Sequence, residues 1–258
     1  MELFDTPYID SPIVRLYMPG DQHHGCQYWA KTQFDADMEA IMNDPYGLVV
    51  IPGDTMQKDL RTSVGNVYAQ TIPPGRQKYV AADRLYPIAK KIIGISGGNH
   101  DEGSRIKEDS TDVEDLCKFL GVHYFEDELS FSISHGRDKY GNPKVWTFYG
   151  IHGCTNSATI GGVANGLRRL NQICDADVYF MGHTHQCLQF SDVYFRRDIS
   201  HRRMVPAVRY YVCSASYQGK DRFPIINAMP GKTVGCPVLT LDSLRNRISI
   251  DLPTGICA

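Results

Sequence analysis

The chain has 258 residues, of which 42% are hydrophobic and 22% charged, as in an ordinary globular protein with a sizeable core. Its formal net charge of −2 excludes a general attraction to nucleic acid or acidic membranes and leaves room only for a local basic patch. No apolar run is long enough to span a bilayer, and residues 1–10 lack the pattern of a secretory signal, so we expect a cytosolic protein with no membrane partner.

Short apolar runs recur along the first part of the chain, and each leads into polar side chains. In order, these are 13–18 before Asp21 and His23, 48–51 before Asp54, 92–95 before Asn99 and His100, 145–151 before His152, and 177–181 before His183 and His185. Such runs are typical of strands buried on both faces, and functional groups of open α/β sheets gather beyond the carboxyl ends of strands. We therefore predict that these side chains converge at one sheet edge.

Apolar residues at helical spacing separate the runs. They predict helices over 34–42, 80–92, 111–120 and around 167–173. The polar stretch 71–79 predicts a loop near the mouth of the site, and the chain after His185 is strand-rich. Because there is no linker, repeat or low-complexity segment, we predict one domain over 1–258, with an α/β half of about 1–185 and a strand-rich half of about 186–258.

The converging side chains form a mixed donor set without thiolates. It comprises two carboxylates, one amide and four imidazoles, from Asp21, Asp54, Asn99, His23, His152, His183 and His185. Nitrogen and oxygen donors suit Mn, Zn, Fe, Co or Ni better than Ca or Cu(I). Seven donors exceed the needs of one catalytic zinc, so a mononuclear zinc hydrolase is the least favoured alternative. They fit two ions about 3.5–4 Å apart that share a carboxylate and generate a hydroxide for attack on phosphorus.

The same motifs carry a resemblance to a known family. Asp21-x-His23, Gly53-Asp54, Gly98-Asn99-His100-Asp101, His152-Gly153 and Gly182-His183-Thr184-His185 resemble, in order, the signature of the calcineurin-like metallophosphoesterases. The resemblance implies an α/β fold, a four-layer α/β/β/α sandwich with two mixed β-sheets. It also implies two divalent ions, Mn in the first place and Zn, Fe, Ni, Co or Mg otherwise. Residues 48–102 and the strand-rich tail further resemble small phosphoesterases encoded by phages and prophages.

The resemblance also implies a role for each residue. One ion takes Asp21, His23 and His185, the second takes Asn99, His152 and His183, and Asp54 bridges the two, while His100 faces the leaving group and protonates it. One position departs from the pattern. Many members carry an acid or Asn three residues after the bridging Asp, where this chain has Gln57, so a phosphatase-like pairing of His100 with an acid at that position is disfavoured. The residue that supports the His100 imidazole would then be Asp101 or a residue elsewhere in the chain.

The predicted function is hydrolysis of a phosphodiester or phosphomonoester, with a nuclease or nucleotide phosphodiesterase favoured over a protein or small-molecule phosphatase. A non-catalytic metal-binding scaffold on the same fold stays open as an alternative. We interpret the basic segment 196–203 as a solvated hairpin turn, with a phosphate-backbone contact to nucleic acid as the less favoured reading. Arg105 is predicted to bind a substrate phosphate as a bidentate donor. The sequence does not indicate the substrate or the oligomeric state.

Overall fold

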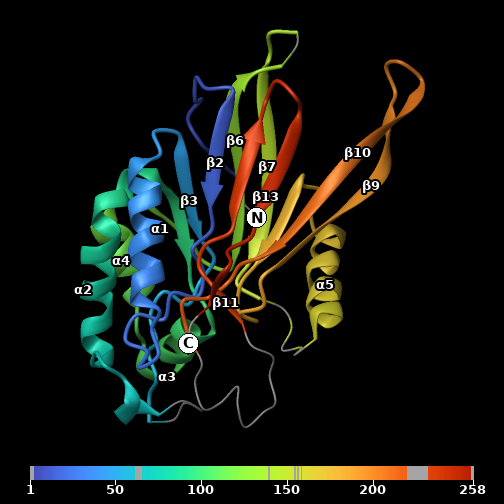
Figure 1. Ribbon diagram of the computed structural model, residues 1–258. Helices are drawn as coiled ribbons and strands as arrows, with labels where there is room; N and C mark the ends of the chain where they lie inside the picture. Colours follow the sequence, from blue (N-terminus) through green and yellow to red (C-terminus); the bar gives the residue numbers. More distant parts are fainter. Residues whose placement is uncertain are drawn as a thin grey trace.

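A computed structural model describes residues 3–61, 66–138, 140–153, 155, 157, 159–219 and 232–256. Two six-stranded sheets form the centre of the molecule (Figure 1). The strands of the first sheet are β2 (Ile13–Tyr17), β3 (Gly47–Ile51), β4 (Ile92–Ser96), β5 (His123–Phe125), β12 (Val238–Asp242) and β13 (Arg247–Asp251). Those of the second are β1 (Phe4–Asp5), β6 (Glu128–Arg137), β7 (Pro143–Ile151), β8 (Val178–Met181), β9 (Leu188–Asp198) and β10 (Arg203–Cys213). A short pair, β11 (Thr233–Val234) and β14 (Gly255–Ile256), forms a third sheet.

Both large sheets are mixed. The first has the order β13-β12-β2-β3-β4-β5, and the second has the order β1-β6-β7-β8-β10-β9. In the first sheet β2, β3, β4 and β5 run parallel, and in the second β7, β8 and β10 do. The carboxyl ends of these parallel strands point to the same end of the sandwich, the lower end in Figure 1.

Helices cover the outer faces of the two sheets. The described helices are α1 (Lys31–Asn43), α2 (Pro74–Leu85), α3 (Asn99–Glu108), α4 (Asp112–Leu120) and α5 (Ile160–Arg169), with 3-10 turns η1 (Val67–Ala69), η2 (Tyr86–Lys91) and η3 (Leu170–Gln172). Helix α3 lies at the lower end of the molecule in Figure 1, and the other four cover the sheets. Apolar residues of α1, α2 and α4 pack on the outer face of the first sheet, and those of α5 pack on the second. A separate apolar cluster fills the space between the sheets. The predicted four-layer sandwich is therefore confirmed.

Helices α1, α2, α4 and α5 overlap the predicted segments and differ from them at their ends. α1 and α4 lie where they were predicted, and α4 ends at Gly121, whose φ of +68° is the left-handed conformation that glycine tolerates. The loop predicted over 71–79 is wrong from Pro74 onward, because α2 starts there. A proline fits the first turn of a helix, where its missing N–H has no partner to lose. The polar helix α3 was not predicted at all, since only Asp101 and Ser104 of it are buried.

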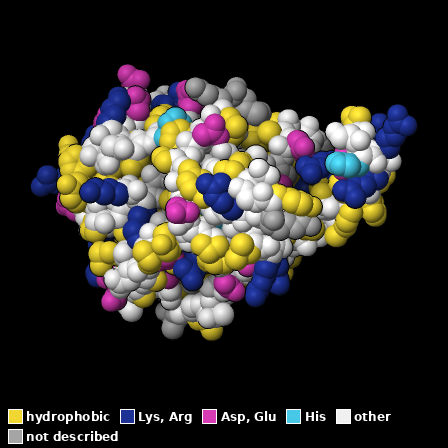
Figure 2. Space-filling view, turned by 90° about the horizontal axis from the view of Figure 1, so that it is seen from above, with side chains coloured by type: hydrophobic (Ala, Val, Ile, Leu, Met, Phe, Trp, Pro, Cys, Tyr) yellow, Lys and Arg dark blue, Asp and Glu magenta, His cyan; other side chains and the backbone are white. Residues whose placement is uncertain are grey.

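The basic segment lies at the turn of the β9–β10 hairpin, as we interpreted it. Asp198 accepts hydrogen bonds from His201 Nδ1 at 3.0 Å and Arg203 Nε at 3.2 Å. The hairpin projects from the body, and basic side chains gather at its end (Figures 1 and 2). Strand β10 returns over 11 residues, which is about 33 Å of strand, to the opposite end of the sheet. None of the described helices is long and apolar enough to cross a membrane.

An ion-pair cluster ties the loop after β3 to helices α2 and α4. Lys58, which is buried, bonds the Asp112 carboxylate, and Lys78 Nζ lies 2.9 Å from Asp112 Oδ1. Burial opposes the shift, but the hydrogen bonds from Lys58 and Lys78 lower the pKa of Asp112 to about 2.

This depressed pKa predicts a loss of stability in acid. A carboxyl group that titrates near 2 in the folded chain and near 4 in the unfolded chain contributes about 2 kcal/mol above pH 4, and that contribution disappears as the pH falls from 4 to 2. We expect the difference in unfolding free energy between the wild type and Asp112→Asn to shrink over this interval. Urea unfolding at several pH values measures it, and a difference that stays constant from pH 6 to pH 2 would contradict the assignment.

Candidate metal centre

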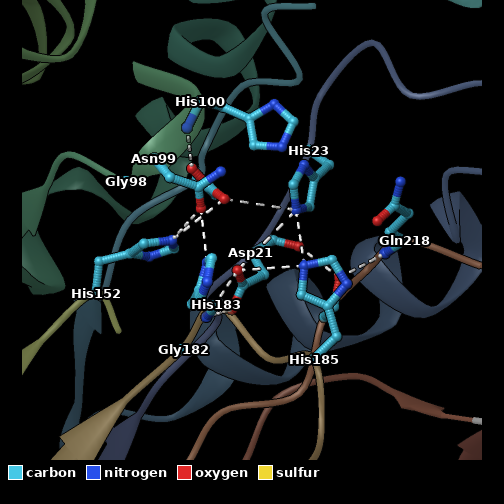
Figure 3. Close-up of polar contacts among 12 residues, drawn as sticks. Asp21, His23, Gly98, Asn99, His100, His152, Gly182, His183, His185 and Gln218 are labelled. Carbon is cyan, nitrogen blue, oxygen red and sulfur yellow. Dashed lines mark hydrogen bonds and ion pairs between the residues drawn. The ribbon is translucent and has the colours of Figure 1, made fainter. Parts of the chain in front are cut away.

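The structure brings all seven predicted donors together at the carboxyl ends of the parallel strands (Figure 3). Asp21 and His23 follow β2, Asp54 follows β3, Asn99 begins α3 after β4, His152 follows β7, and His183 and His185 follow β8. His24 is turned away from this cluster, with its ring centre 5.2 Å from that of Trp29 and 5.0 Å from that of Phe34. Of the two neighbouring histidines, His23 therefore joins the donors and His24 packs among aromatic rings.

The backbone at the cluster is strained. Positive φ angles occur at Asp21, His23, Asp54, His183 and His185, at 47°, 51°, 47°, 67° and 55°. This region is unfavourable for residues with a Cβ and persists where surrounding contacts impose it. Here the loops after β2 and β3 hold each other, because the amide of Asp21 donates to the Gly53 carbonyl at 3.2 Å and that of His23 to the Asp54 carbonyl at 3.0 Å. Such strain concentrates at functional sites.

Two glycines permit the close approach of the donors. Gly53 has a φ of +85°, and a Cβ there would collide with the His152 ring. A Cβ on Gly98 would collide with the Asp54 carboxylate. A side chain at either position would therefore push apart two of the converging loops.

The first group of donors is Asp21, His23 and His185. The Nε2 atoms of His23 and His185 lie 3.0 Å apart. Asp21 Oδ1 lies 3.4 Å from His185 Nε2 and 4.0 Å from His23 Nε2. The Asp21 carboxylate also accepts a hydrogen bond from the amide of His183, at 2.9 Å to Oδ2, which fixes its orientation.

The second group is Asp54, Asn99, His152 and His183. Asn99 Oδ1 lies 3.0 Å from His152 Nε2 and 2.7 Å from His183 Nδ1. Asp54 Oδ2 lies 3.2 Å from His152 Nε2 and also 3.9 Å from His23 Nε2, a member of the first group. One oxygen of Asp54 therefore faces both groups.

These spacings suit metal ligands. Atoms bound about 2.1 Å from one ion lie about 3.0 Å apart at the corners of an octahedron and about 3.4 Å apart in a tetrahedron. The contacts within both groups, from 2.7 to 3.4 Å for the closest pairs, match these edges. The donor types, imidazole nitrogen with carboxylate and amide oxygen, are those of Mn, Zn or Fe sites. The residues present thus fit a pair of divalent ions.

The charges of the cluster are poorly balanced among the side chains alone. Burial raises the pKa of Asp21 above its usual value and lowers the pKa of His23 to about 3. Burial also opposes ionisation of Asp54, but His152, His100 and His23 together outweigh it and hold the pKa of Asp54 well below its usual value. In turn Asp54 overcomes the burial of His152 and raises its pKa to about 10. A cation among these donors would stabilise the ionised carboxylates and favour the neutral, metal-binding form of the imidazoles.

His100 lies beside the donors and has its own partners. Its ring centre is 4.9 Å from that of His23, and its Nδ1 contacts the carbonyl oxygen of Gln57. Burial lowers the pKa of His100, but Asp54, the Gln57 carbonyl and Asp59 outweigh it and raise that pKa. Asp101, one candidate for supporting His100, instead accepts a hydrogen bond from the amide of Gly98 at 3.0 Å and caps α3.

A cavity of about 380 Å³ adjoins Asn99 and His152. Carboxyl groups on its wall come from Asp101, Glu102, Asp112, Glu114, Glu126 and Asp127. Those of Glu102 and Asp112 are paired with basic side chains, so the acidic character rests mainly on the others. Arg105 lines the same cavity and is exposed, with Nε and Nη2 bonded to the Glu102 carboxylate at 2.7 and 2.8 Å. The structure thus places Arg105 on the wall of the cavity that adjoins the donors, with its guanidinium paired to Glu102.

Two residues near the cluster were missed in the sequence. Burial lowers the pKa of Lys232, and the Asp21 carboxylate opposes this, so the ammonium group belongs to the electrostatic environment of the site. Asp59 lies 3.9 Å from His100. No motif includes Lys232, and Asp59 lies two positions beyond the motif position at Gln57, so no spacing rule indicated either one.

No protein-family model matches the sequence, and no match is found among curated proteins. Solved structures that the chain resembles include the calcineurin-like phosphoesterase YfkN from Bacillus subtilis (12% identity, 93% of this chain and 90% of that one, TM-score 0.43). Others are a metallophosphoesterase from Sphaerobacter thermophilus (11%, 94% and 89%, 0.43) and Vps29 complexed with Zn²⁺ from Entamoeba histolytica (13%, 92% and 97%, 0.40). Identities and scores this low carry no information on function, which must come from the site.

Proposed function

We propose that this protein is a phosphoesterase that uses two divalent metal ions. The observation that supports this most strongly is the shared position of Asp54. Donor atoms of Asp54, His152 and His183 lie within 4.8 Å of one another, and those of His23, Asp54 and His100 do so as well. A third group with the same spacing joins Asp21, His23 and His185. A carboxylate common to neighbouring groups is the arrangement that a bridged metal pair requires.

In this proposal Asp21, His23 and His185 hold one ion, Asn99, His152 and His183 hold the other, and Asp54 contacts both. Mn is the metal we favour, with Zn, Fe, Ni, Co and Mg as alternatives. When bound, the two ions would polarise the phosphoryl oxygens and lower the pKa of the attacking water. Because the site has nitrogen and oxygen ligands and no thiolates, the bound ions would be hard Lewis acids that readily bind phosphate oxygens.

The chain's own residues supply the remaining steps. His100 lies at the edge of the donor cluster, within 4.8 Å of donor atoms of Asp54 and His23, where it can give a proton to the departing oxygen. Asp54 keeps its geometry because its Oδ1 accepts a hydrogen bond from the His100 amide at 3.0 Å. Lys232 adds a positive charge on the side of Asp21 and can attract the anionic substrate.

The acidic cavity bears on the class of substrate. A polynucleotide would bring several phosphates against the carboxyl groups of Glu126 and Asp127, which repel them. The basic end of the β9–β10 hairpin lies at the opposite end of the sheet from the donors and does not offset this. We therefore propose a small phosphodiester or phosphomonoester, a mononucleotide derivative included, over nucleic acid. Kinship with phage-encoded phosphoesterases stays a prediction.

A substrate screen with added Mn²⁺ tests the proposal. It should include aryl mono- and diesters, cyclic nucleotides, and single- and double-stranded DNA and RNA. We expect hydrolysis of at least one small ester at a rate well above that of the polynucleotides. Metal-loaded protein that hydrolyses no ester would support a non-catalytic scaffold instead, and faster cleavage of DNA or RNA than of any small ester would overturn the substrate class.

Arg105 is proposed to contact substrate in the cavity. Because its guanidinium is exposed and already paired with Glu102, its net contribution should be small. We expect Arg105→Ala to raise KM about 2- to 5-fold and to leave kcat nearly unchanged. Steady-state kinetics with the best small ester measures this. An unchanged KM would remove Arg105 from the substrate contacts.

A further inference from the structure

Asp59 is a buried carboxylate with an unusual set of neighbours. Only 5% of the residue is exposed, and its one ion pair within the described ranges is with His100, whose Nδ1 lies 3.9 Å from Asp59 Oδ1. Burying a carboxylate is costly unless hydrogen bonds and a positive partner compensate it. The burial of Asp59 therefore needs an explanation, and His100 is the neighbouring group that can carry positive charge.

Neutral amides hold Asp59 in place. Gln57 Nε2 donates to Asp59 Oδ2 at 2.9 Å. Gln70 clamps the backbone of Asp59, since its Oε1 accepts from the Asp59 amide at 3.2 Å and its Nε2 donates to the Asp59 carbonyl at 2.9 Å. Gln77 Nε2 in turn donates to Gln70 Oε1 at 2.7 Å. These contacts orient the carboxylate and leave its charge unneutralised.

The contact of His100 with Gln57 determines which ring nitrogen carries a proton. A backbone carbonyl can only accept a hydrogen bond, so the Nδ1 of His100 must be the donor. Asp59 lies on the same side of the ring. Nε2 is then the nitrogen left to pass a proton to a substrate, and the ring cannot turn over without losing the Gln57 contact.

We infer that Asp59, together with the Gln57 carbonyl, is the positioning group of His100. This inference rests on the proposed phosphoesterase function. The acid that the family pattern leads one to expect three residues after Asp54 is instead supplied five residues after it, and the side chain of Gln57 at the expected position serves to orient that acid. During turnover the proton on Nε2 moves to the leaving oxygen, while the proton on Nδ1 stays in its hydrogen bond to the Gln57 carbonyl, with the Asp59 carboxylate 3.9 Å from Nδ1.

Kinetics with a series of aryl phosphodiesters, from p-nitrophenyl to phenyl, tests this arrangement. In Asp59→Asn, which keeps the shape and removes the charge, we expect kcat for the phenyl ester to fall about 10-fold and kcat for the p-nitrophenyl ester to fall less than about 3-fold. KM and metal content should not change. Asp59→Glu should recover part of the loss. Asp44→Asn is the matched control, because Asp44 is also a buried carboxylate but pairs with Tyr17 and Arg15 away from the donors.

Equal losses for both esters, or the same loss in Asp44→Asn, would show a merely structural effect and overturn the inference. A second measurement needs neither a variant nor activity. Nitrogen-15 NMR of the metal-free wild type should find the neutral form of His100 protonated at Nδ1, and protonation at Nε2 alone would overturn the inference. If the wild type hydrolyses no ester, the proposed function fails while the NMR result still decides the placement of the Nδ1 proton.

Discussion

Replacing Asp54 by Asn is expected to reduce turnover on the order of 10³-fold or more and to weaken the binding of both metal ions. The carboxylate is nearly fully buried, and its Oδ2 faces His152 at 3.2 Å and His23 at 3.9 Å, so it is the one anion common to the two donor groups. Asparagine keeps the size of the side chain but cannot supply the shared negative charge. Hydrolysis of bis-p-nitrophenyl phosphate with added Mn²⁺, together with elemental analysis, measures both effects.

Asp44→Asn again serves as the control, since it removes a buried carboxylate at a distance from the donors and should retain activity and metal. Circular dichroism and the unfolding midpoint check that Asp54→Asn is folded. Retained activity in a folded Asp54→Asn protein would rule out a bridged metal pair and leave a single-ion site as the alternative.

Replacing His100 by Ala should slow the hydrolysis of esters with poor leaving groups roughly 10²-fold and activated aryl esters much less. An alkoxide needs a proton as it leaves, whereas p-nitrophenolate does not. The side chain lies outside the seven donors, so the metal content should remain that of the wild type. The measurement compares the rates at which the variant and the wild type hydrolyse a p-nitrophenyl ester and an alkyl ester of the same acid. An equal decrease in rate for both esters would contradict the general-acid role of His100.

Much of the fold could be predicted because its determinants are local. Short apolar runs that lead into polar side chains marked β2, β3, β4, β7 and β8, and helical spacing marked α1 and α4. Helix α3 could not be found this way, because it buries little besides Asp101 and Ser104 and so shows no apolar stripe. The start of α2 at Pro74 was misread, because a Pro-Pro-Gly sequence is typical of turns as well as of first helical turns.

The convergence of the donors could be predicted because side chains that follow parallel strands meet at the carboxyl ends of those strands. The geometry of the donors could not be predicted in this way. The left-handed backbone at Asp21 and Asp54 arises from the hydrogen bonds between the loops after β2 and β3, which join residues far apart in sequence. The role of Asp59 depends on a side-chain contact from Gln57 and a clamp from Gln70, and neither follows a fixed spacing. Tertiary contacts of this kind depend on how loops and helices pack together, so the spacing of residues in a motif does not predict them.

A metal titration followed by activity tests the central proposal most directly. Metal-free protein is titrated with Mn²⁺ while bound metal and hydrolysis of the best small ester are measured in parallel. We expect activity to rise until about two equivalents are bound per chain and then to level off, because two ions share Asp54. Full activity at one equivalent, or two bound ions without hydrolysis of any ester, would contradict it.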